Sequence, residues 1–233
     1  MFPSFVLSNV KRIQRMIERS DVPNERFREL VEPIRDLFYA YGLKNLSMDD
    51  ISHRLGISKK TLYTFVKNKE ELLEKIFLHE DDRLMMMSEE MDKLNINAIE
   101  KLLKISQLVN EEMKRINPMI RFEMQKYYSQ LYDLFVERKR RNVFEGMKVN
   151  IQQGILEKIY RDDINVDLVA TIYLNSFIEL HNSDICKMLD INFIQLFEVL
   201  FENHIRAIST SAGLAYFESR KKEIMEFINT NKK

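Results

Sequence analysis

Residues 47–69 read SMDDISHRLGISKKTLYTFVKNK and decide the expected fold, because they divide into two very short helices and the start of a third. Ser47 can cap the first helix, with Asp50 in the capping-box position three residues later. Gly56 can adopt the left-handed conformation that ends a helix without steric strain. Ser58 can then cap a second helix. Caps at this spacing predict short helices that meet at a tight turn.

Helices this short need support from packing, since isolated helices of fewer than about 12 residues are marginal in water. The apolar pairs Ile51–Leu55 and Leu62–Val66 are each four residues apart, so each pair shares one helix face. Asn68 can cap the helix that follows. A helix, a tight turn that contains glycine and a second helix together are typical of a helix-turn-helix.

The second short helix leaves a group of polar side chains free of core packing: Lys59, Lys60, Thr61, Tyr63 and Thr64. Residues 44–69 contain six Lys or Arg and two Asp, a local charge of +4 in a chain whose formal net charge is zero. A recognition helix places its N-terminal residues against base edges, and cations bind the phosphates. The stretch therefore predicts DNA binding. A small helical hairpin with a solvated basic face is the alternative.

The same stretch resembles the DNA-binding domain of the TetR family of bacterial transcriptional repressors. The motifs that carry the resemblance are Leu37-Phe38 with Gly42, Ser47 to Ile51-Ser52, Gly56-Ile57-Ser58, Thr61-Leu62-Tyr63 and Asn68-Lys69-Glu70. Two departures from the family pattern are Lys60 before Thr61, and Thr64-Phe65 after Tyr63. The DNA sequence of the operator therefore cannot be taken from the family.

We predict that the DNA-contacting residues divide by role. Lys59 and Lys60, together with Thr64, reach base edges. The predicted phosphate contacts are Ser47, Thr61, Tyr63 and Lys69, and Ser58 completes the DNA-binding set. Loss of a base contact relaxes specificity at one base, whereas loss of a phosphate contact weakens binding to all sequences alike.

The composition is typical of a soluble all-α protein. Among 233 residues, 31% are charged and 45% hydrophobic, with only five glycines and four prolines. Cys186 is the single cysteine, so an internal disulfide is excluded and a reducing compartment is favoured. No apolar run approaches the ~18 residues of a membrane span. The segment 2–7 is too short for the core of a signal peptide. We therefore expect a cytoplasmic protein without a membrane partner.

Turn residues and apolar spacing divide the chain into three parts: an N-terminal extension at 1–24, a helix-turn-helix domain at 25–75, and an effector-binding and dimerisation domain at 76–233. The extension contains a basic amphipathic helix that packs on the body, adds phosphate contacts as an arm, or is disordered. The expected longer helices are 25–41, 69–94, 98–116, 118–128, 129–153, 166–181, 192–208 and 213–229, and Gly154 is expected to interrupt the fifth.

The family resemblance implies a small-molecule effector site in the second domain. The pocket candidates are the apolar and aromatic residues on the helices that enclose the ligand in that family: Met87, Phe122, Tyr127, Phe144, Met147, Tyr173 and Phe177. Such a pocket suits a mostly apolar molecule held by a few polar groups. Ordinary core filling is the alternative for the methionines at 85–91, because methionine fills irregular gaps.

The resemblance also implies a homodimer through the helices at 165–182 and 191–208. The second of these has an apolar seam that contains more large side chains than one core face needs: Phe193, Leu196, Phe197, Leu200, Phe201 and His204.

Other patterns give weaker signals. The basic run 138–141 spans more than one helical turn, so its side chains cannot share one face. A solvated surface is its simplest interpretation, and binding of an anionic ligand or DNA is the alternative. The four histidines include no pair four residues apart, and the glycine loops and catalytic motifs of common enzymes are absent. We therefore expect no metal, no cofactor and no catalytic site.

These patterns favour a TetR-like transcriptional regulator that represses. The family resemblance implies a homodimer whose two heads occupy successive major grooves of a palindromic operator, until an effector shifts the heads apart. The alternative is a helical adaptor or structural protein that has lost operator recognition. Such a protein could use its basic N-terminal helix to contact a partner or a membrane surface.

Overall fold

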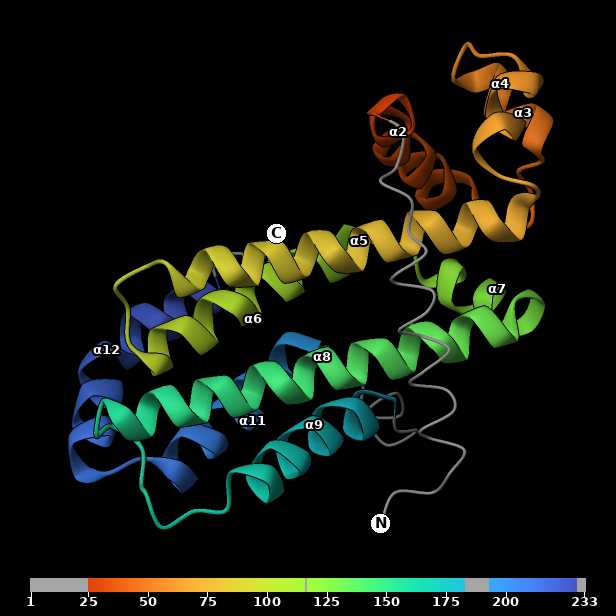
Figure 1. The fold of residues 1–233 in the computed structure, drawn as a ribbon. Helices are drawn as coiled ribbons and strands as arrows, with labels where there is room; N and C mark the ends of the chain where they lie inside the picture. The colour runs from red at the N-terminus through yellow and green to blue at the C-terminus, as the bar shows by residue number, and fades with distance from the viewer. Residues whose placement is uncertain (1–24, 116, 183–192, 230–233) are drawn as a thin grey trace. The chain divides into compact units, whose positions relative to one another are not determined.

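The computed structural model describes residues 25–115, 117–182 and 193–229, and every regular element in these ranges is a helix, as predicted (Figure 1). None of the helices in these ranges is long and apolar enough to cross a membrane. The basic helix predicted within residues 1–24 lies outside them. The elements are α2 (Glu25–Tyr41), α3 (Met48–Arg54), α4 (Lys59–Phe65), α5 (Lys69–Asp92), α6 (Ala98–Arg115), α7 (Pro118–Tyr127), α8 (Ser129–Leu156), α9 (Val166–Asn182), α11 (Phe193–Ile208) and α12 (Ser211–Asn229).

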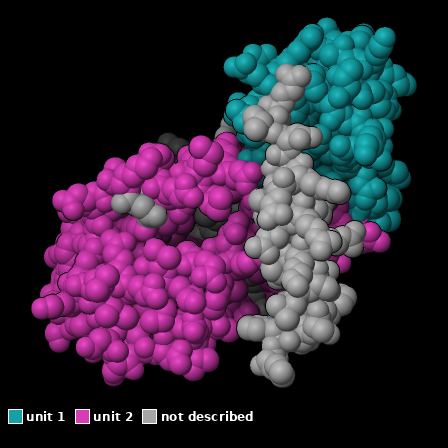
Figure 2. Space-filling view, in the orientation of Figure 1, with its two compact units in different colours: residues 1–79, 117–128 teal, residues 80–116, 129–233 magenta. Residues whose placement is uncertain are grey.

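The chain divides into two compact units, which Figure 2 shows in separate colours. Of the described residues, 25–79 and 117–128 form unit 1, and 80–115, 129–182 and 193–229 form unit 2. Helix α5 therefore begins in unit 1 and ends in unit 2. Helix α7 belongs to unit 1, although α6 and α8 on either side of it in sequence belong to unit 2. The sequence predicts one domain boundary near residue 75, which would place α7 in the second domain instead.

The helix ends in the helix-turn-helix are fixed by the predicted caps. Ser47 Oγ accepts a hydrogen bond from Asp50 N (3.1 Å), and the Asp50 carboxylate accepts one from Ser47 N (2.8 Å), which completes a capping box. Gly56 follows α3 with a φ of +66°, a conformation that glycine adopts without strain. Ser58 Oγ then accepts from Thr61 N (3.0 Å) at the start of α4.

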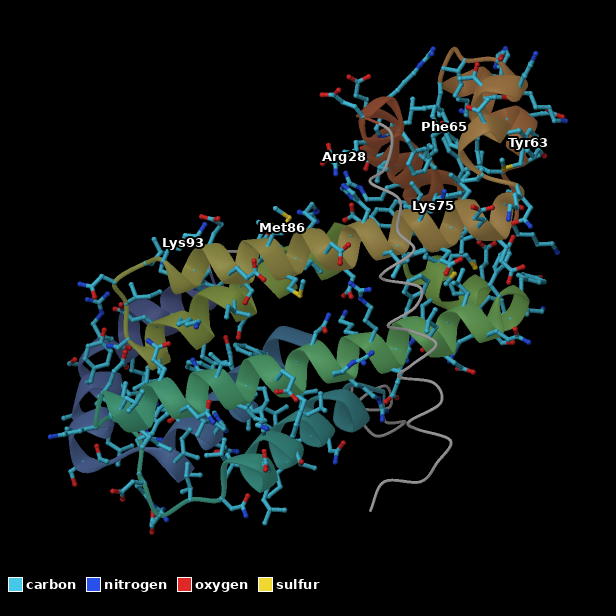
Figure 3. The ribbon with its side chains drawn as sticks, viewed as in Figure 1. Arg28, Tyr63, Phe65, Lys75, Met86 and Lys93 are labelled. Atoms are coloured by element: carbon cyan, nitrogen blue, oxygen red, sulfur yellow. The ribbon has the colours of Figure 1, made fainter. Side chains whose placement is uncertain are left out.

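The core of unit 1 is built from apolar residues three or four positions apart on α2 and from both helices of the helix-turn-helix. This spacing places them on one face of each helix. Phe65, the last residue of α4 (Figure 3), packs against α2, with its ring centroid 5.3 Å from that of Phe27. The fully or almost fully buried apolar residues of unit 1 include Phe27, Val31, Ile34, Phe38, Leu43, Leu46, Ile51, Leu62, Val66, Leu72, Leu73 and Ile76.

Unit 2 has its own core, to which α6, α8, α9, α11 and α12 contribute. Helix α9 packs on α8 and α11, α6 packs on α8, and α12 packs on α11 and α6. Asn150, buried on α8, donates from Nδ2 to the carbonyl of Ala98 on α6 (2.7 Å). The core residues are Ala98, Ile99, Leu102, Leu103, Met147, Ile151, Tyr160, Ala170, Phe197, Phe201, Ile205, Ile208 and Phe217.

The prediction that Gly154 interrupts the long helix is wrong, because α8 continues to Leu156. The ring of Tyr160 folds back onto Gly154, and a Cβ at this position would lie 2.0 Å from Tyr160 Cδ2. The Gly154 carbonyl also accepts from the backbone N–H groups of Ile159 (3.0 Å) and Tyr160 (2.9 Å). The glycine therefore serves close packing inside the last turn of a helix rather than its termination.

Candidate nucleic-acid interface

Helix α4 presents polar side chains to solvent, whereas its apolar side chains Leu62 and Phe65 pack inside unit 1. Lys59, Lys60, Tyr63 and Thr64 are exposed, whereas Leu62 is fully buried. Figure 3 shows the labelled Tyr63 side chain on the α3–α4 part of unit 1. Ammonium and hydroxyl groups on one exposed helix surface can contact both base edges and phosphates.

Lys59 and Lys60, the two predicted base-contacting lysines, differ in their surroundings. Lys59 Nζ lies 2.8 Å from Asp49 Oδ1, and the hydrogen bond to Asp49 raises the pKa of Lys59. Both members of this ion pair are exposed, so DNA can compete for the lysine. Lys60 is exposed, and within the described residues it has no ion-pair partner. Lys60 is therefore the more available cation on α4.

The serine and threonine hydroxyl groups that are predicted to contact DNA already have partners within unit 1. Thr64 Oγ1 donates to Thr61 O (2.6 Å), and the Oγ atoms of Ser58 and Thr61 lie 2.8 Å apart. Ser47 Oγ donates to Asp50 Oδ2 (2.5 Å). A hydroxyl has one donor hydrogen, so Ser47 and Thr64 must exchange these bonds before they can donate to a phosphate or a base.

Lys69, predicted as a phosphate contact, has a structural contact that the sequence did not suggest. Its ammonium donates to the carbonyl oxygens of Leu43 and Leu46 in the turn between α2 and α3. Burial lowers the pKa of Lys69, and the charges of Glu123 and Asp50 oppose this effect. The ammonium thus stabilises the turn that leads into the helix-turn-helix, and we expect this role in place of the phosphate contact that the sequence suggested.

Helix α7 supplies a second contact to the same turn, which the sequence analysis missed. Glu123 is only 6% exposed, and its Oε2 accepts from the backbone N–H groups of Leu43 and Lys44, the latter at 3.1 Å. Lys44 Nζ also donates to Tyr127 Oη (3.2 Å). Glu123 and Leu43 are 80 positions apart, so no local pattern links them. The only signal in the sequence is an acid placed among apolar residues of a short helix.

Three of the predicted pocket residues come together in unit 2. Met147 belongs to its core, and Phe144 and Tyr173 pack against that core. Burial raises the pKa of Tyr173 above its ordinary value. These three side chains therefore belong to the packed interior of unit 2, where the Tyr173 hydroxyl lies among mostly apolar groups.

The other pocket candidates do not join that group. Phe122 and Tyr127 lie on α7 in unit 1, where they are 54% and 42% exposed. Met87 is half-buried on α5, with its sulfur 3.4 Å from Arg83 Nη1. The side chain of Phe177 lies outside the described part of the chain.

The apolar seam predicted on α11 is largely taken up by the core of unit 2. Phe197 and Phe201 are buried, with ring centroids 5.5 Å apart. His204 is buried 4.6 Å from the ring of Tyr173, and burial lowers its pKa to about 4. Leu196 and Leu200 are half-buried. The side chain of Phe193 lies outside the description.

Other apolar side chains on α9 and α11, the two helices predicted to form the dimer, are exposed to solvent. On α9, Leu168 and Ile172 are 61% and 65% exposed, and on α11 Val199 is 58% exposed. Leu168 and Ile172 are four residues apart and therefore share one face of α9. The exposed apolar groups of α9 and α11 thus differ from the seam that the sequence suggested.

The basic run at 138–141 is only partly a solvated surface. Arg138 forms ion pairs with both Asp81 and Asp82 of α5, and Asn142 Nδ2 donates to Asp81 Oδ2 (3.1 Å). This cluster ties α8 to the part of α5 that belongs to unit 2. Among the described residues, no group of three or more His, Cys, Asp or Glu side chains is arranged to hold a metal ion.

Comparison with known sequences supports the interpretation of unit 1. Residues 30–76 match the model for bacterial regulatory proteins of the tetR family. The HTH-type transcriptional repressor KstR2 of Mycolicibacterium smegmatis is 27% identical over 161 residues, which cover 63% of this chain and 73% of that protein. KstR2 of Mycobacterium tuberculosis is 26% identical over 149 residues, which cover 63% of this chain and 74% of that protein.

Solved structures support the fold over most of the chain. A transcriptional regulator from Cytophaga hutchinsonii aligns with a TM-score of 0.63 at 16% identity, covering 80% of this chain and all of that one. The fatty acid degradation regulator FadR from Bacillus halodurans aligns with a TM-score of 0.58 at 12% identity, covering 79% of this chain and 97% of that one. At these identities the likeness concerns the fold alone.

Proposed function

We propose that this chain is a transcriptional regulator of the TetR family that binds a palindromic operator as a homodimer and releases it when an effector occupies unit 2. The observation that carries the proposal is the exposed polar surface of α4. This helix is the second helix of a helix-turn-helix in which both helices begin at a capping serine. In this arrangement the second helix enters the major groove, and two symmetric heads contact half-sites about 34–36 Å apart.

Lys60 is the residue on which we base the test of DNA recognition. It is exposed near the N-terminus of α4, the end of a recognition helix that reads base edges. A lost bidentate contact to a base costs roughly 1–3 kcal/mol of discrimination. We therefore expect Lys60→Ala to weaken binding to the preferred duplex by about tenfold or more, with a much smaller effect on random DNA.

The experiment first selects duplexes from a random library with the wild-type chain, and then compares affinities by fluorescence anisotropy. Lys104→Ala is the matched control, because Lys104 is an exposed lysine of unit 2 and its loss changes the net charge equally. Enrichment of a palindrome, and a loss confined to Lys60→Ala, support the proposal. If no duplex is enriched, the chain is better described as a helical adaptor without operator recognition.

The homodimer is supported by the exposed apolar side chains Leu168, Ile172 and Val199 on α9 and α11. Large apolar groups in water on two helices of one unit are favourable sites for a second copy, because association removes their surface from water. Half-buried Leu196 and Leu200 of the predicted seam can extend such an interface from α11. A dimer would also supply the twofold symmetry that a palindromic operator requires.

The effector site is supported by the group of Phe144, Met147 and Tyr173 in unit 2, which suits a largely apolar molecule. An effector can shift the regulator only by the difference in its affinity for the two states, and typical couplings are about 1–3 kcal/mol. Operator DNA must then weaken effector binding by the same factor. Titration of an effector found by thermal shift, with and without the selected duplex, measures this reciprocity. Equal effector affinities in both titrations would contradict the regulatory role.

A further inference from the structure

We propose that Glu123 of α7 is a positioning residue for DNA recognition, because its carboxylate holds the turn at residues 42–46 from which the helix-turn-helix begins. The inference rests on the proposed function and adds to it a residue that lies outside the helix-turn-helix. All the contacts involved lie within unit 1.

The carboxylate is fitted closely to the turn. Gly42 ends α2 with a φ of +82°, and an added Cβ there would lie 3.0 Å from Glu123 Oε2. This Oε2 accepts from two successive backbone N–H groups, those of Leu43 and Lys44. Beyond the left-handed residue these N–H groups have left the helix and need other acceptors. A charged acceptor forms stronger hydrogen bonds than a neutral one, so the buried acid fixes the backbone at this point.

The backbone N–H and the backbone carbonyl of Leu43 form hydrogen bonds with side chains of opposite charge. Its N–H donates to Glu123, and its carbonyl accepts from the ammonium of Lys69. Lys69 also bonds the carbonyl of Leu46, directly before the N-cap residue Ser47. The turn is therefore fixed from α7 on one side and from α5 on the other, and its position determines where α3 begins. Helix α4 follows α3 through a short turn, so its direction depends on the same anchor.

Two further bonds hold α7 against the same part of unit 1. Asn117 Nδ2 donates to the Tyr39 carbonyl near the end of α2 (3.2 Å), and Lys44 Nζ donates to Tyr127 Oη (3.2 Å). Asn117 also caps α7 by accepting from Met119 N (2.9 Å). Both ends of α7 thus contact the end of α2 and the turn, and Glu123 lies between these two contacts in the sequence.

A positioning role differs measurably from a purely structural one. Glu123 lies on α7 and contacts the backbone of the turn, so its loss should not alter the cations that bind phosphates. Non-specific affinity and its salt dependence should then stay unchanged, because they follow the number of neutralised phosphates. Specific affinity should fall, because base contacts depend on the direction of α4. A residue that only stabilises the fold would lower the melting temperature without changing the ratio of the two affinities.

The test compares the full-length Glu123→Gln variant with Glu32→Gln, which removes the same charge from an exposed position on α2. The probes are the duplex selected with the wild type and a random duplex of equal length. We expect Glu123→Gln to bind the selected duplex about tenfold more weakly, with unchanged affinity for random DNA. A tenfold change in affinity corresponds to about 1.4 kcal/mol. Glu32→Gln should match the wild type. Equal ratios of specific to random affinity in both variants would overturn the inference.

Hydrogen exchange on the wild-type chain provides a measurement that does not depend on whether the variant folds. The amides of Leu43 and Lys44 should exchange slowly, and more slowly still when the selected duplex is bound. Fast exchange in both states would refute the contact with Glu123. If the wild type binds the selected duplex and the Glu123 variant binds it equally well, the inference alone fails. If the wild type enriches no duplex, the proposed function fails and the inference fails with it.

Discussion

Replacing Lys69 by methionine should destabilise the protein without removing a phosphate contact. The substitution keeps a long apolar stem and deletes the ammonium that donates to the carbonyls of Leu43 and Leu46. Hydrogen bonds that involve a charged group contribute roughly 1.5–3 kcal/mol each when buried. Lys69 is only half-buried, so solvent reduces this value, and we expect a decrease of about 2 kcal/mol in the free energy of unfolding.

Two measurements separate this role from a phosphate contact. Urea unfolding gives the loss of stability, and DNA affinity across salt concentrations gives the number of phosphates neutralised. A phosphate-binding lysine contributes about 0.9 to the slope of log affinity against log salt. We expect Lys69→Met to leave this slope unchanged. Lys67→Met, at an exposed neighbouring position, is the comparison variant. Wild-type stability together with a slope reduced by about one unit would refute our reasoning on Lys69.

Three further predictions concern unit 2. Gly154→Ala should lower the free energy of unfolding by about 1–3 kcal/mol, because the new Cβ meets the Tyr160 ring. Gly146 has open space around it, so Gly146→Ala should not destabilise α8. Urea unfolding of both variants tests this difference. Ile172→Glu should give monomers by light scattering with unchanged helix content, and an intact dimer would count against the proposed interface. Burial lowers the pKa of His204 to about 4. In the unfolded chain its pKa is about 6.5, so below this pH the unfolded state takes up a proton that the folded state does not. The free energy of unfolding is therefore highest above pH 6.5 and decreases as pH falls towards 4, by about 2 kcal/mol at pH 5. His204→Gln should remove this dependence from urea unfolding curves.

The helix-turn-helix could be predicted because its determinants are local. The cap pairs Ser47 with Asp50 and Ser58 with Thr61 are each three residues apart, and the structure confirms them as hydrogen bonds. Their geometry depends on a few neighbouring residues and hardly on the rest of the chain. The same reasoning gave the approximate bounds of the longer helices and the all-α fold.

Two predictions depended on information that the sequence pattern does not contain. An apolar face on α11 can pack against the chain's own core or against a partner, and both give the same spacing. In the structure Phe197 and Phe201 face the core, so the pattern indicated burial without its direction. A glycine in a helical pattern can likewise end the helix or allow close packing. For Gly154 the deciding contact is with Tyr160, which lies beyond the end of the same helix.

The contact between Glu123 and the turn could not be predicted at all, for a different reason. Its two sides are 80 residues apart, and an acid on a short helix is most often solvated. Only the tertiary structure reveals that this carboxylate is buried against backbone N–H groups. Lys69 was assigned to phosphate because its position matches the family motif, whereas the structure shows its ammonium bonded to carbonyls.

The membership of α7 in unit 1 has a consequence for how the protein is made. A chain leaving the ribosome exposes residues 25–79 well before residues 117–128, at roughly 5–20 residues per second. Until α7 has been synthesised, the N–H groups of Leu43 and Lys44 lack the carboxylate that they bind in the finished protein. Unit 1 of the nascent chain is therefore incomplete for several seconds, during which part of unit 2 is already emerging. The same discontinuity means that a fragment ending at residue 79 is not a transplantable module, and a fusion that borrows this head must carry α7 with it.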